Sequence, residues 1–214
     1  MSNSNEAIEK EGWDYLDDIL MNVYHSDPLE TFGTLIPYGA GGNDPLPQVS
    51  VYETETYYHY ITYGFSNLGK AKLKDDGSIP QYSGYGFELT LKIKKEQVNN
   101  LIWIPALFQS YARYIYETGN YFTANQFIGA DPNSTEGINP EKDSTITGFV
   151  TTYDNDFGIV ETPNGKVEFV QLVGITQPEL KMICTKEISA KEMVGKIFEL
   201  DSRLITDLYR NSII

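Results

Sequence analysis

Residue types that hold metal ions are scarce in this sequence. The 214 residues include two histidines, His25 and His59, and one cysteine, Cys184. Zinc sites use three or four such ligands at characteristic spacings, and no two of these residues stand at one. The sequence therefore predicts no metal site and no cofactor. His59 lies in an aromatic segment and is interpreted as a packed or hydrogen-bonded structural residue.

The segment 154–158, Asp-Asn-Asp-Phe-Gly, resembles the start of a calcium-binding loop. Such a loop places an oxygen ligand at its fifth position and a glutamate at its twelfth. Gly158 stands at the fifth position here, and the twelfth is not a glutamate. The segment therefore predicts a turn rather than a calcium site.

A glycine-rich stretch at 39–42 invites comparison with phosphate-binding loops. That motif requires a Lys-Ser or Lys-Thr pair and a strand-to-helix context, and the sequence supplies neither. We expect instead an irregular loop over 32–47, packed by Leu35, Ile36 and Tyr38.

Nucleophiles and acid–base pairs are also hard to assemble. No Gly-x-Ser-x-Gly elbow is present, and Cys184 lies in an apolar helical segment that indicates a buried, inert thiol. Glu88 and Glu168 occupy the polar positions of alternating strand patterns, so we expect both carboxylates to face solvent. An enzyme with an unrecognised carboxylate and tyrosine cleft is therefore the third of three functional alternatives, and we predict no catalytic residue.

Tyrosine is abundant, with 16 residues in the chain. Its apolar ring and polar tip suit both β-strands and recognition surfaces. The residues alone leave binding and core packing equally open for the following tyrosines: Tyr57, Tyr58, Tyr60, Tyr63, Tyr82, Tyr85 and Tyr111.

The formal net charge of −14 narrows the range of partners. Such a field repels nucleic acid and anionic membranes and attracts a basic protein. A single cysteine fits a reducing compartment, residues 1–10 do not form a signal peptide, and no apolar run approaches a membrane span. We expect a cytoplasmic protein that binds a protein partner, with no nucleic acid and no membrane.

The central stretch is a strand followed by a helix. Apolar and polar residues alternate over 87–94, which predicts a strand with one buried and one solvated face, preceded by a bulge or a close backbone approach at Gly84 and Gly86. Pro105 lies in the first turn of the helix, and Gly119-Asn120 is expected to end it. This helix should lie across the apolar face of the sheet through the following stripe: Leu107, Phe108, Tyr111, Ala112 and Ile115.

Flanking patterns complete one domain over residues 1–214. A first helix is predicted over 6–25, buried through Trp13, Leu16, Leu20 and Val23. Further strands are expected at 49–53, 57–65, 145–153, 157–161 and 166–175, the last covered on both faces. Capping boxes at Thr176 and Ser189 predict two closing helices, and 204–209 predicts a short strand or turn. The predicted fold class is α+β, with a mixed, mainly antiparallel sheet and helices packed on it.

An ordered set of short segments is more specific than any one motif. The segments are Thr34–Tyr38, Gly42–Leu46, His59–Ser66, Gly84–Thr90, Trp103–Pro105, Ala112–Tyr114, Thr162–Gly174 and Leu204–Leu208. In this order they resemble the Suppressor of fused family, specifically its N-terminal-type domain and the stand-alone bacterial proteins that share it. The resemblance covers nearly the whole chain.

The resemblance implies a mixed α+β fold and a non-enzymatic binding role. In animals, members of the family hold Hedgehog-pathway transcription factors by clamping an extended peptide between two domains. We expect no second domain here, so that clamp does not carry over. Bacterial members are associated with polymorphic toxin systems as immunity proteins, and an acidic immunity protein would meet a basic toxin quickly because complementary fields speed encounter.

Two binding hypotheses follow. The first is an immunity protein that neutralises a toxin, with a basic toxin domain as the expected partner; the second is a scaffold or regulator that clamps an extended peptide of a partner. The family's partner-contacting segment falls near 68–82, where this sequence departs from the family pattern. The candidate partner-binding residues are Tyr63, Asp75, Asp76, Tyr82 and Tyr85.

Overall fold

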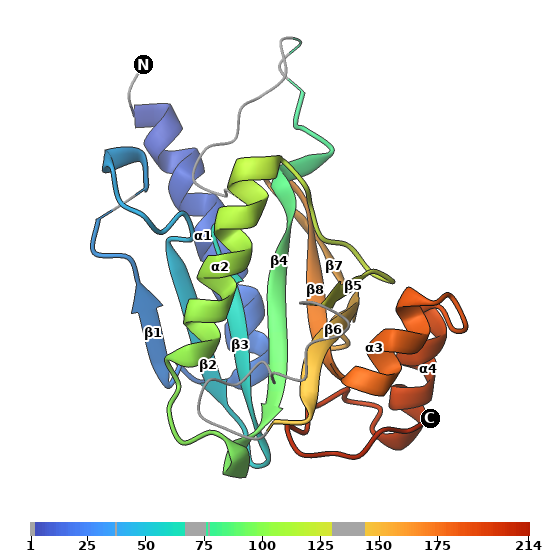
Figure 1. Ribbon diagram of the computed structural model, residues 1–214. Helices are drawn as coiled ribbons and strands as arrows, with labels where there is room; N and C mark the ends of the chain where they lie inside the picture. The colour runs from blue at the N-terminus through green and yellow to red at the C-terminus, as the bar shows by residue number, and fades with distance from the viewer. Residues whose placement is uncertain (1–2, 37, 67–75, 77, 130–143) are drawn as a thin grey trace.

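A computed structural model describes residues 3–36, 38–66, 76, 78–129 and 144–214, with side chains from residue 14 onward. One eight-stranded sheet runs through the molecule in the order β1-β2-β3-β4-β8-β6-β5, and β7 also pairs with β8 (Figure 1). Among the described strands, only β4 and β8 pair in parallel; the other strand pairs are antiparallel. The predicted fold class, a mixed and mainly antiparallel sheet with packed helices, is confirmed.

The elements follow the predicted order with small shifts at their ends. The helices are α1 (Asn3–Tyr24), α2 (Trp103–Thr118), α3 (Gln177–Cys184) and α4 (Ala190–Leu200), with 3-10 turns η1 (Tyr38–Ala40) and η2 (Lys95–Gln97). The strands are β1 (Glu30–Gly33), β2 (Gln48–Glu53), β3 (Tyr57–Tyr63), β4 (Tyr82–Lys94), β5 (Phe127–Gly129), β6 (Ile146–Tyr153), β7 (Ile159–Thr162) and β8 (Gly165–Thr176).

Helix α2 covers one face of the sheet, as the strand and helix patterns predicted. Phe108, Ala112 and Ile115 are fully buried and belong to the same cluster as Leu89 and Leu91 of β4. Gly119 ends the helix in the left-handed conformation, with φ 72°, and its N–H donates to the carbonyl of Ile115. The spacing of apolar residues alone therefore located both this helix and the face that it buries.

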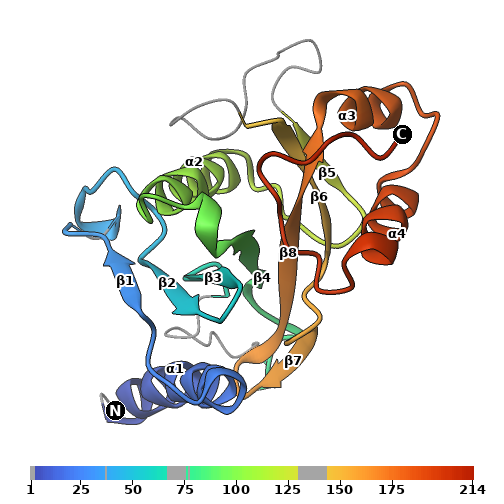
Figure 2. The same ribbon diagram turned by 90° about the horizontal axis from the view of Figure 1, so that it is seen from below.

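The other face of β4 is not solvated, which corrects the alternating-strand prediction. Glu88, Thr90 and Lys92 are at most 1% exposed. Helix α1 lies on the opposite side of the strands from α2 (Figure 2), where Leu16 and Leu20 pack with residues of β2, β3 and β8. The polar side chains of β4 are buried because each finds a partner inside the protein.

Among the described side chains, the buried stripe of α1 differs from the predicted one at Val23. Leu16 and Leu20 are fully buried, and Tyr24 continues their spacing by stacking on Tyr52 with ring centroids 4.1 Å apart. Val23 is 38% exposed and lies outside the stripe. The side chain of Trp13 is outside the described residues.

Helices α3 and α4 begin at the two predicted capping boxes, Thr176 with Glu179 and Ser189 with Glu192. They cover the face of β6 and β8 that α2 leaves open, around Val150, Val173 and Ile175. Cys184 is exposed, so the prediction of a buried thiol is wrong. Leu180 and Ile183 take the inward side of this short helix and leave Cys184 on the outer side.

The segment 32–47 also differs from its prediction. A short edge strand, β1, pairs with β2 before the loop begins. Leu35 and Ile36 are 100% and 58% exposed, so they do not pack the loop. Tyr38 is 47% exposed, and its ring packs edge-on against Tyr116 of α2, with centroids 5.5 Å apart. Further along, β5 pairs with β6 in a stretch for which no strand was predicted. Residues 67–75 and 130–143 lie outside the described part.

Strand β8 is the shared element of the sheet. It pairs with β4 on one side and with β7 and then β6 on the other, and Val167, Phe169, Val170 and Leu172 are fully buried. The prediction that both of its faces are covered is confirmed. Beyond it, Thr206 in the predicted terminal strand or turn bridges Ile93 in parallel.

Candidate functional site

The structure separates the predicted partner-binding residues. Tyr63 is 2% exposed, and its hydroxyl donates to Asp17 Oδ1 of α1 at 3.0 Å, so it joins a helix to the sheet inside the protein. Asp76 is exposed, and Asp75 lies outside the described residues. Tyr82 and Tyr85 come together on β4 beside a surface depression.

We call this depression the tyrosine hollow. It has a volume of about 420 Å³. Within the described chain it is lined by Tyr82, Gly84, Tyr85, Gly86, Phe87, Tyr121, Phe122, Thr123 and Glu168. Tyr82 and Tyr121, at 42% and 64% exposed, form the open rim, whereas Phe87 and Phe122 are at most 9% exposed and form the floor.

A break in the pairing of β4 with β8 opens the hollow. Tyr82 pairs with Lys166, and the next pair is Phe87 with Glu168, so the β4 residues between them have no counterpart in the ladder. Gly84 and Gly86 have φ of 56° and 84°, which favours glycine. The expected bulge at these glycines is confirmed.

Gly86 also makes room for the rim. A Cβ on this residue would lie 3.0–3.2 Å from atoms of the Tyr82 side chain, so the tyrosine rests directly against the glycine backbone. Tyr85 points its ring toward Tyr116, with centroids 5.4 Å apart. The bulge thus sets the positions of both predicted tyrosines.

One carboxylate faces the aromatic rings. Glu168 lines the hollow, and its Oε2 accepts a hydrogen bond from the Thr123 hydroxyl at 2.9 Å. Tyr121 and Thr123 come from the connection after α2, where no helix or strand was predicted, and no motif marked them. An aromatic hollow with one fixed acid can bind a side chain or a small cation.

Glu88 is on strand β4 and lies in a closed nest of neutral donors. Its carboxylate accepts from the Thr62 hydroxyl at 2.6 Å, from the Gly64 N–H at 2.9 Å, and from the Ser66 N–H and hydroxyl at 2.9 and 2.5 Å. Burial raises the pKa of Glu88, although these hydrogen bonds oppose the shift. Glu88 and Glu168 share no partner among these bonds, so they do not form an acid pair.

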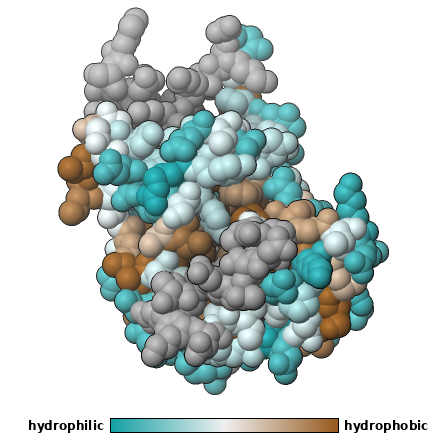
Figure 3. Space-filling view, in the orientation of Figure 1, coloured by the Kyte–Doolittle hydropathy of each residue, from teal (hydrophilic) through white to brown (hydrophobic). Residues whose placement is uncertain are grey.

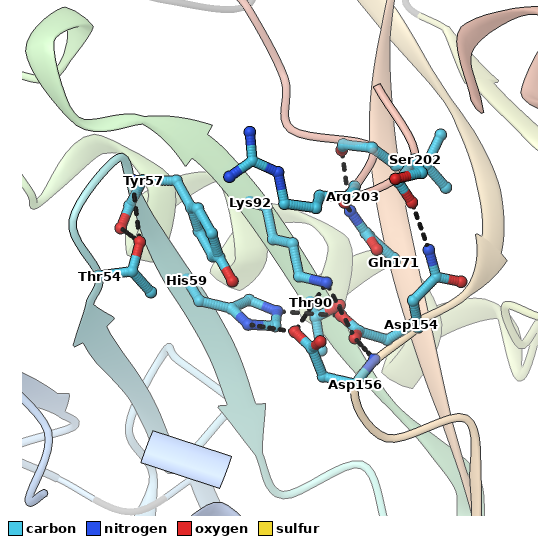
Figure 4. Close-up of polar contacts among 12 residues, drawn as sticks. Thr54, Tyr57, His59, Thr90, Lys92, Asp154, Asp156, Gln171, Ser202 and Arg203 are labelled. Carbon is cyan, nitrogen blue, oxygen red and sulfur yellow. Dashed lines mark hydrogen bonds and ion pairs between the residues drawn. The ribbon is translucent and has the colours of Figure 1, made fainter. Parts of the chain in front are cut away.

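Further along β3 and β4, a charged cluster joins His59 and Lys92 to Asp154 and Asp156 (Figure 4). Lys92 Nζ lies 3.2 Å from Asp154 Oδ1 and 2.8 Å from Asp156 Oδ2. His59 Nε2 lies 3.0 Å from Asp154 Oδ2, and the Thr90 hydroxyl donates to the same oxygen at 2.6 Å. Both aspartates are held by the turn between β6 and β7.

The pKa values of Asp154 and Lys92 are shifted by the neighbouring groups of this cluster. Burial would raise the pKa of Asp154, but contact with His59 and Lys92 outweighs it and holds that pKa well below 3.8. Burial would lower the pKa of Lys92, but Asp154 and Asp156 raise it above 10.5. The cluster is therefore a set of mutually compensating charges.

Solvent has almost no access to His59, Lys92 and Asp154, which indicates a structural role for the cluster. His59, Lys92 and Asp154 are at most 1% exposed, and the hydroxyl of Tyr24 closes the remaining ring nitrogen of His59. The predictions of a structural His59 and of a turn at 154–158 are confirmed, and Gly158 donates to the Asp154 carbonyl with φ 62°. The sequence did hold one signal of this cluster: a lysine inside an apolar strand needs an acid.

The described residues hold neither a metal-binding cluster nor a membrane-spanning helix. They include no group of three or more His, Cys, Asp or Glu side chains placed to hold a metal ion. In the same part of the chain, no helix is both long and apolar enough to cross a membrane.

Sequence comparison gives the family. Residues 42–211 match the family described as Suppressor of fused protein (SUFU). The chain is 31% identical over 209 residues to the Suppressor of fused homologs of Homo sapiens and Mus musculus, covering 88% of itself and 40% of each of them. The chain belongs to the Suppressor of fused family, and it spans about 40% of the length of these curated relatives.

Structural comparison agrees. A chain of the crystal structure of a Sufu–Fu complex superimposes with a TM-score of 0.81 at 26% identity, over 94% of this chain and 92% of that one. Drosophila Suppressor of Fused gives a TM-score of 0.79 at 26% identity, over 94% of this chain and 50% of that one. The hollow and the charged cluster lie within the family match, whereas α1 and β1 precede it.

Proposed function

We propose that residues 1–214 form one protein-binding domain of the Suppressor of fused type, without enzymatic activity, that neutralises a basic toxin domain in the cytoplasm. The observation that carries this proposal is the open tyrosine hollow on a chain of net charge −14. Tyrosine is enriched at protein interfaces because its ring supplies apolar contact and its hydroxyl a hydrogen bond. A structure of a Sufu–Fu complex supports a binding role for this fold.

The surface favours recognition by charge with a small anchor. On the face shown in Figure 3, outside the grey residues, hydrophobic surface forms separate patches divided by hydrophilic residues. A long-lived obligate interface is usually broader and more apolar. A strongly acidic field would instead raise the rate at which a basic partner arrives.

We still propose four of the predicted residues as partner contacts: Tyr82, Tyr85, Asp75 and the exposed Asp76. Tyr121 joins them because it is the more exposed side of the hollow's rim. We assign Tyr63 a structural role instead of a partner contact, because its hydroxyl bonds Asp17 and so ties α1 to the sheet. Its substitution would act on the partner only through the fold.

The test is capture of the tagged protein from its own cells at low and high salt, with bound proteins identified by mass. We expect one stoichiometric basic partner, whose purified toxin domain associates more slowly as salt is added. Tyr82→Ser and Tyr121→Ser should weaken the complex, whereas Tyr209→Ser, an exposed tyrosine outside the hollow's lining, should not. Absence of a partner at both salts, or association independent of salt, would contradict the proposal.

A second candidate is a scaffold or regulator that clamps an extended peptide. Within the described residues, strand β1 pairs only with β2 and its other edge has no partner strand, and Leu35 and Ile36 follow it with 100% and 58% exposure. A peptide strand could add at such an edge and cover these side chains. A short linear peptide that reproduces the partner's full affinity would favour this candidate over a folded toxin.

A further inference from the structure

We propose that the tyrosine hollow is an arginine-binding site that receives one guanidinium from a basic protein partner. This inference rests on the proposed function and names the chemistry of contact. It commits the site to a single side chain, because a volume of about 420 Å³ is at the small end of ligand pockets.

The aromatic rings supply the first requirement of a cation site. Tyr82 and Tyr121 stand at the rim, with Phe87 and Phe122 below them. Phe122 meets Phe87 and Tyr111 edge-on, with centroids 6.1 and 5.9 Å apart, so its orientation is fixed by packing. A cation over the face of an aromatic ring is attracted by the ring quadrupole, more strongly when water is excluded.

The carboxylate of Glu168 supplies the second requirement. It is half-buried at the hollow, and the Thr123 hydroxyl fixes it through one oxygen. Lys166, two residues earlier on β8, is paired with Glu161 at 3.1 Å. The nearby lysine is thus matched by another acid, which leaves the charge of Glu168 to attract a cation from outside.

Arginine fits these features better than lysine. Its planar guanidinium can stack on an aromatic ring while its edge donates two hydrogen bonds to a carboxylate. A lysine ammonium is a compact, strongly hydrated charge and would lose more water on entering between the rings. The pairing of flat rings with one acid therefore selects a flat cation.

The experiment titrates the whole protein with N-acetyl-arginine amide and follows backbone amide signals by two-dimensional NMR. The matched probe is N-acetyl-citrulline amide, which has nearly the same shape without the charge. We expect the arginine probe to shift the amides of Gly84 and Gly86, which line the hollow. The citrulline probe should bind at least about fivefold more weakly, as expected for loss of a cation–π contact and an ion pair.

Three variants locate the site. Glu168→Gln keeps the shape and an acceptor for Thr123 but removes the charge, and Tyr121→Leu removes a ring at a position that is 64% exposed. Each should weaken arginine binding by about fivefold. Glu199→Gln removes an equal charge from an exposed position of α4, outside the hollow's lining, and should leave the affinity within about twofold.

The inference is wrong if citrulline binds as well as arginine, if the shifts map elsewhere, or if N-acetyl-lysine amide binds more tightly. Its failure is distinct from failure of the proposed function. A captured basic partner with no arginine response would keep the function and remove this site. Arginine binding without a captured partner would support the arginine site and contradict the proposed toxin-binding function.

Discussion

Glu88 and Asp154 are two buried carboxylates at the central strands, and their pKa values are shifted in opposite directions. Glu88 receives only hydroxyl and backbone N–H donors, and its pKa is raised. Asp154 faces Lys92 and His59, and its pKa is lowered. Burial disfavours both negative charges, so the difference comes from the charge of the partners.

Opposite shifts give opposite contributions to stability. The folded protein holds the Asp154 carboxylate more firmly than the unfolded chain does, so this group stabilises above about pH 3.8 and loses its contribution as pH falls below that value. Folded Glu88 holds its proton more firmly than the unfolded chain, so ionising it costs stability as pH rises above about 4.5. At neutral pH one acid stabilises the fold through its charge, and the other destabilises it.

The largest effect should come from Asp154→Ala. It leaves Lys92 and His59 buried without their main acid, and breaking such a pair typically costs about 3–5 kcal/mol. Denaturant unfolding at neutral pH measures the change. Asp201→Ala removes the acid of a more exposed pair with Arg203 and should cost no more than about 1 kcal/mol; equal losses would show that the buried charges are not coupled.

Leu91→Ala calibrates the comparison against a purely apolar change. Leu91 is fully buried on the α2 side of β4, so its truncation should lower the free energy of unfolding by about 2–5 kcal/mol. The same denaturant series measures it. A negligible loss would mean that the strand face is assigned to the wrong side.

Arg210→Met extends the comparison to a third buried acid. Burial would raise the pKa of Glu179, but Arg210 and backbone donors lower it, and the guanidinium meets both carboxylate oxygens at 2.5 Å. We expect a loss of about 2 kcal/mol at pH 7, less than for Asp154, because the N–H groups of Thr176 and Ile213 stay in place. The loss should shrink as pH falls through the range where Glu179 takes up a proton; a loss independent of pH would contradict the ionic explanation.

The smallest effect should come from Glu88→Gln. The amide oxygen can accept from Gly64 and Ser66, and the amide N–H can turn toward Thr62, so the cost should be about 1 kcal/mol. The informative measurement is the difference in unfolding free energy from wild type between pH 4.5 and 8. We expect the variant to gain on wild type as pH rises, and the opposite trend would reverse the sign assigned to Glu88.

Local pattern was enough for much of the fold. The stripe of α2, the double capping boxes and the apolar run of β8 each depend on neighbours in sequence, and the structure has them as predicted. Strand β1 was not predicted, because four residues beside a glycine- and proline-rich segment are too few to show a periodic pattern.

The candidate site was harder to predict from the sequence than the fold. Glu88 and Lys92 were assigned to solvent because alternation in a strand reports polarity, whereas burial depends on which distant donors or acids arrive. Tyr82 and Tyr85 were named from residue type, but Tyr121, Thr123 and Glu168 join them only through the bulge and the loop after α2. Position in space, rather than motif, assembles this surface.

The parallel pairing of β4 with β8 also sets an order of events during folding. Strands β2, β3 and β4 follow one another closely and pair as antiparallel neighbours, so they can associate soon after leaving the ribosome. The other edge of β4 gains its partner only when β8 has been synthesised, after α2, β5, β6 and β7. Such distant contacts form slowly, and an unpaired strand edge invites aggregation. The last third of the chain, which contains β8, therefore covers the exposed edge of β4 and protects the strands made earlier from aggregation.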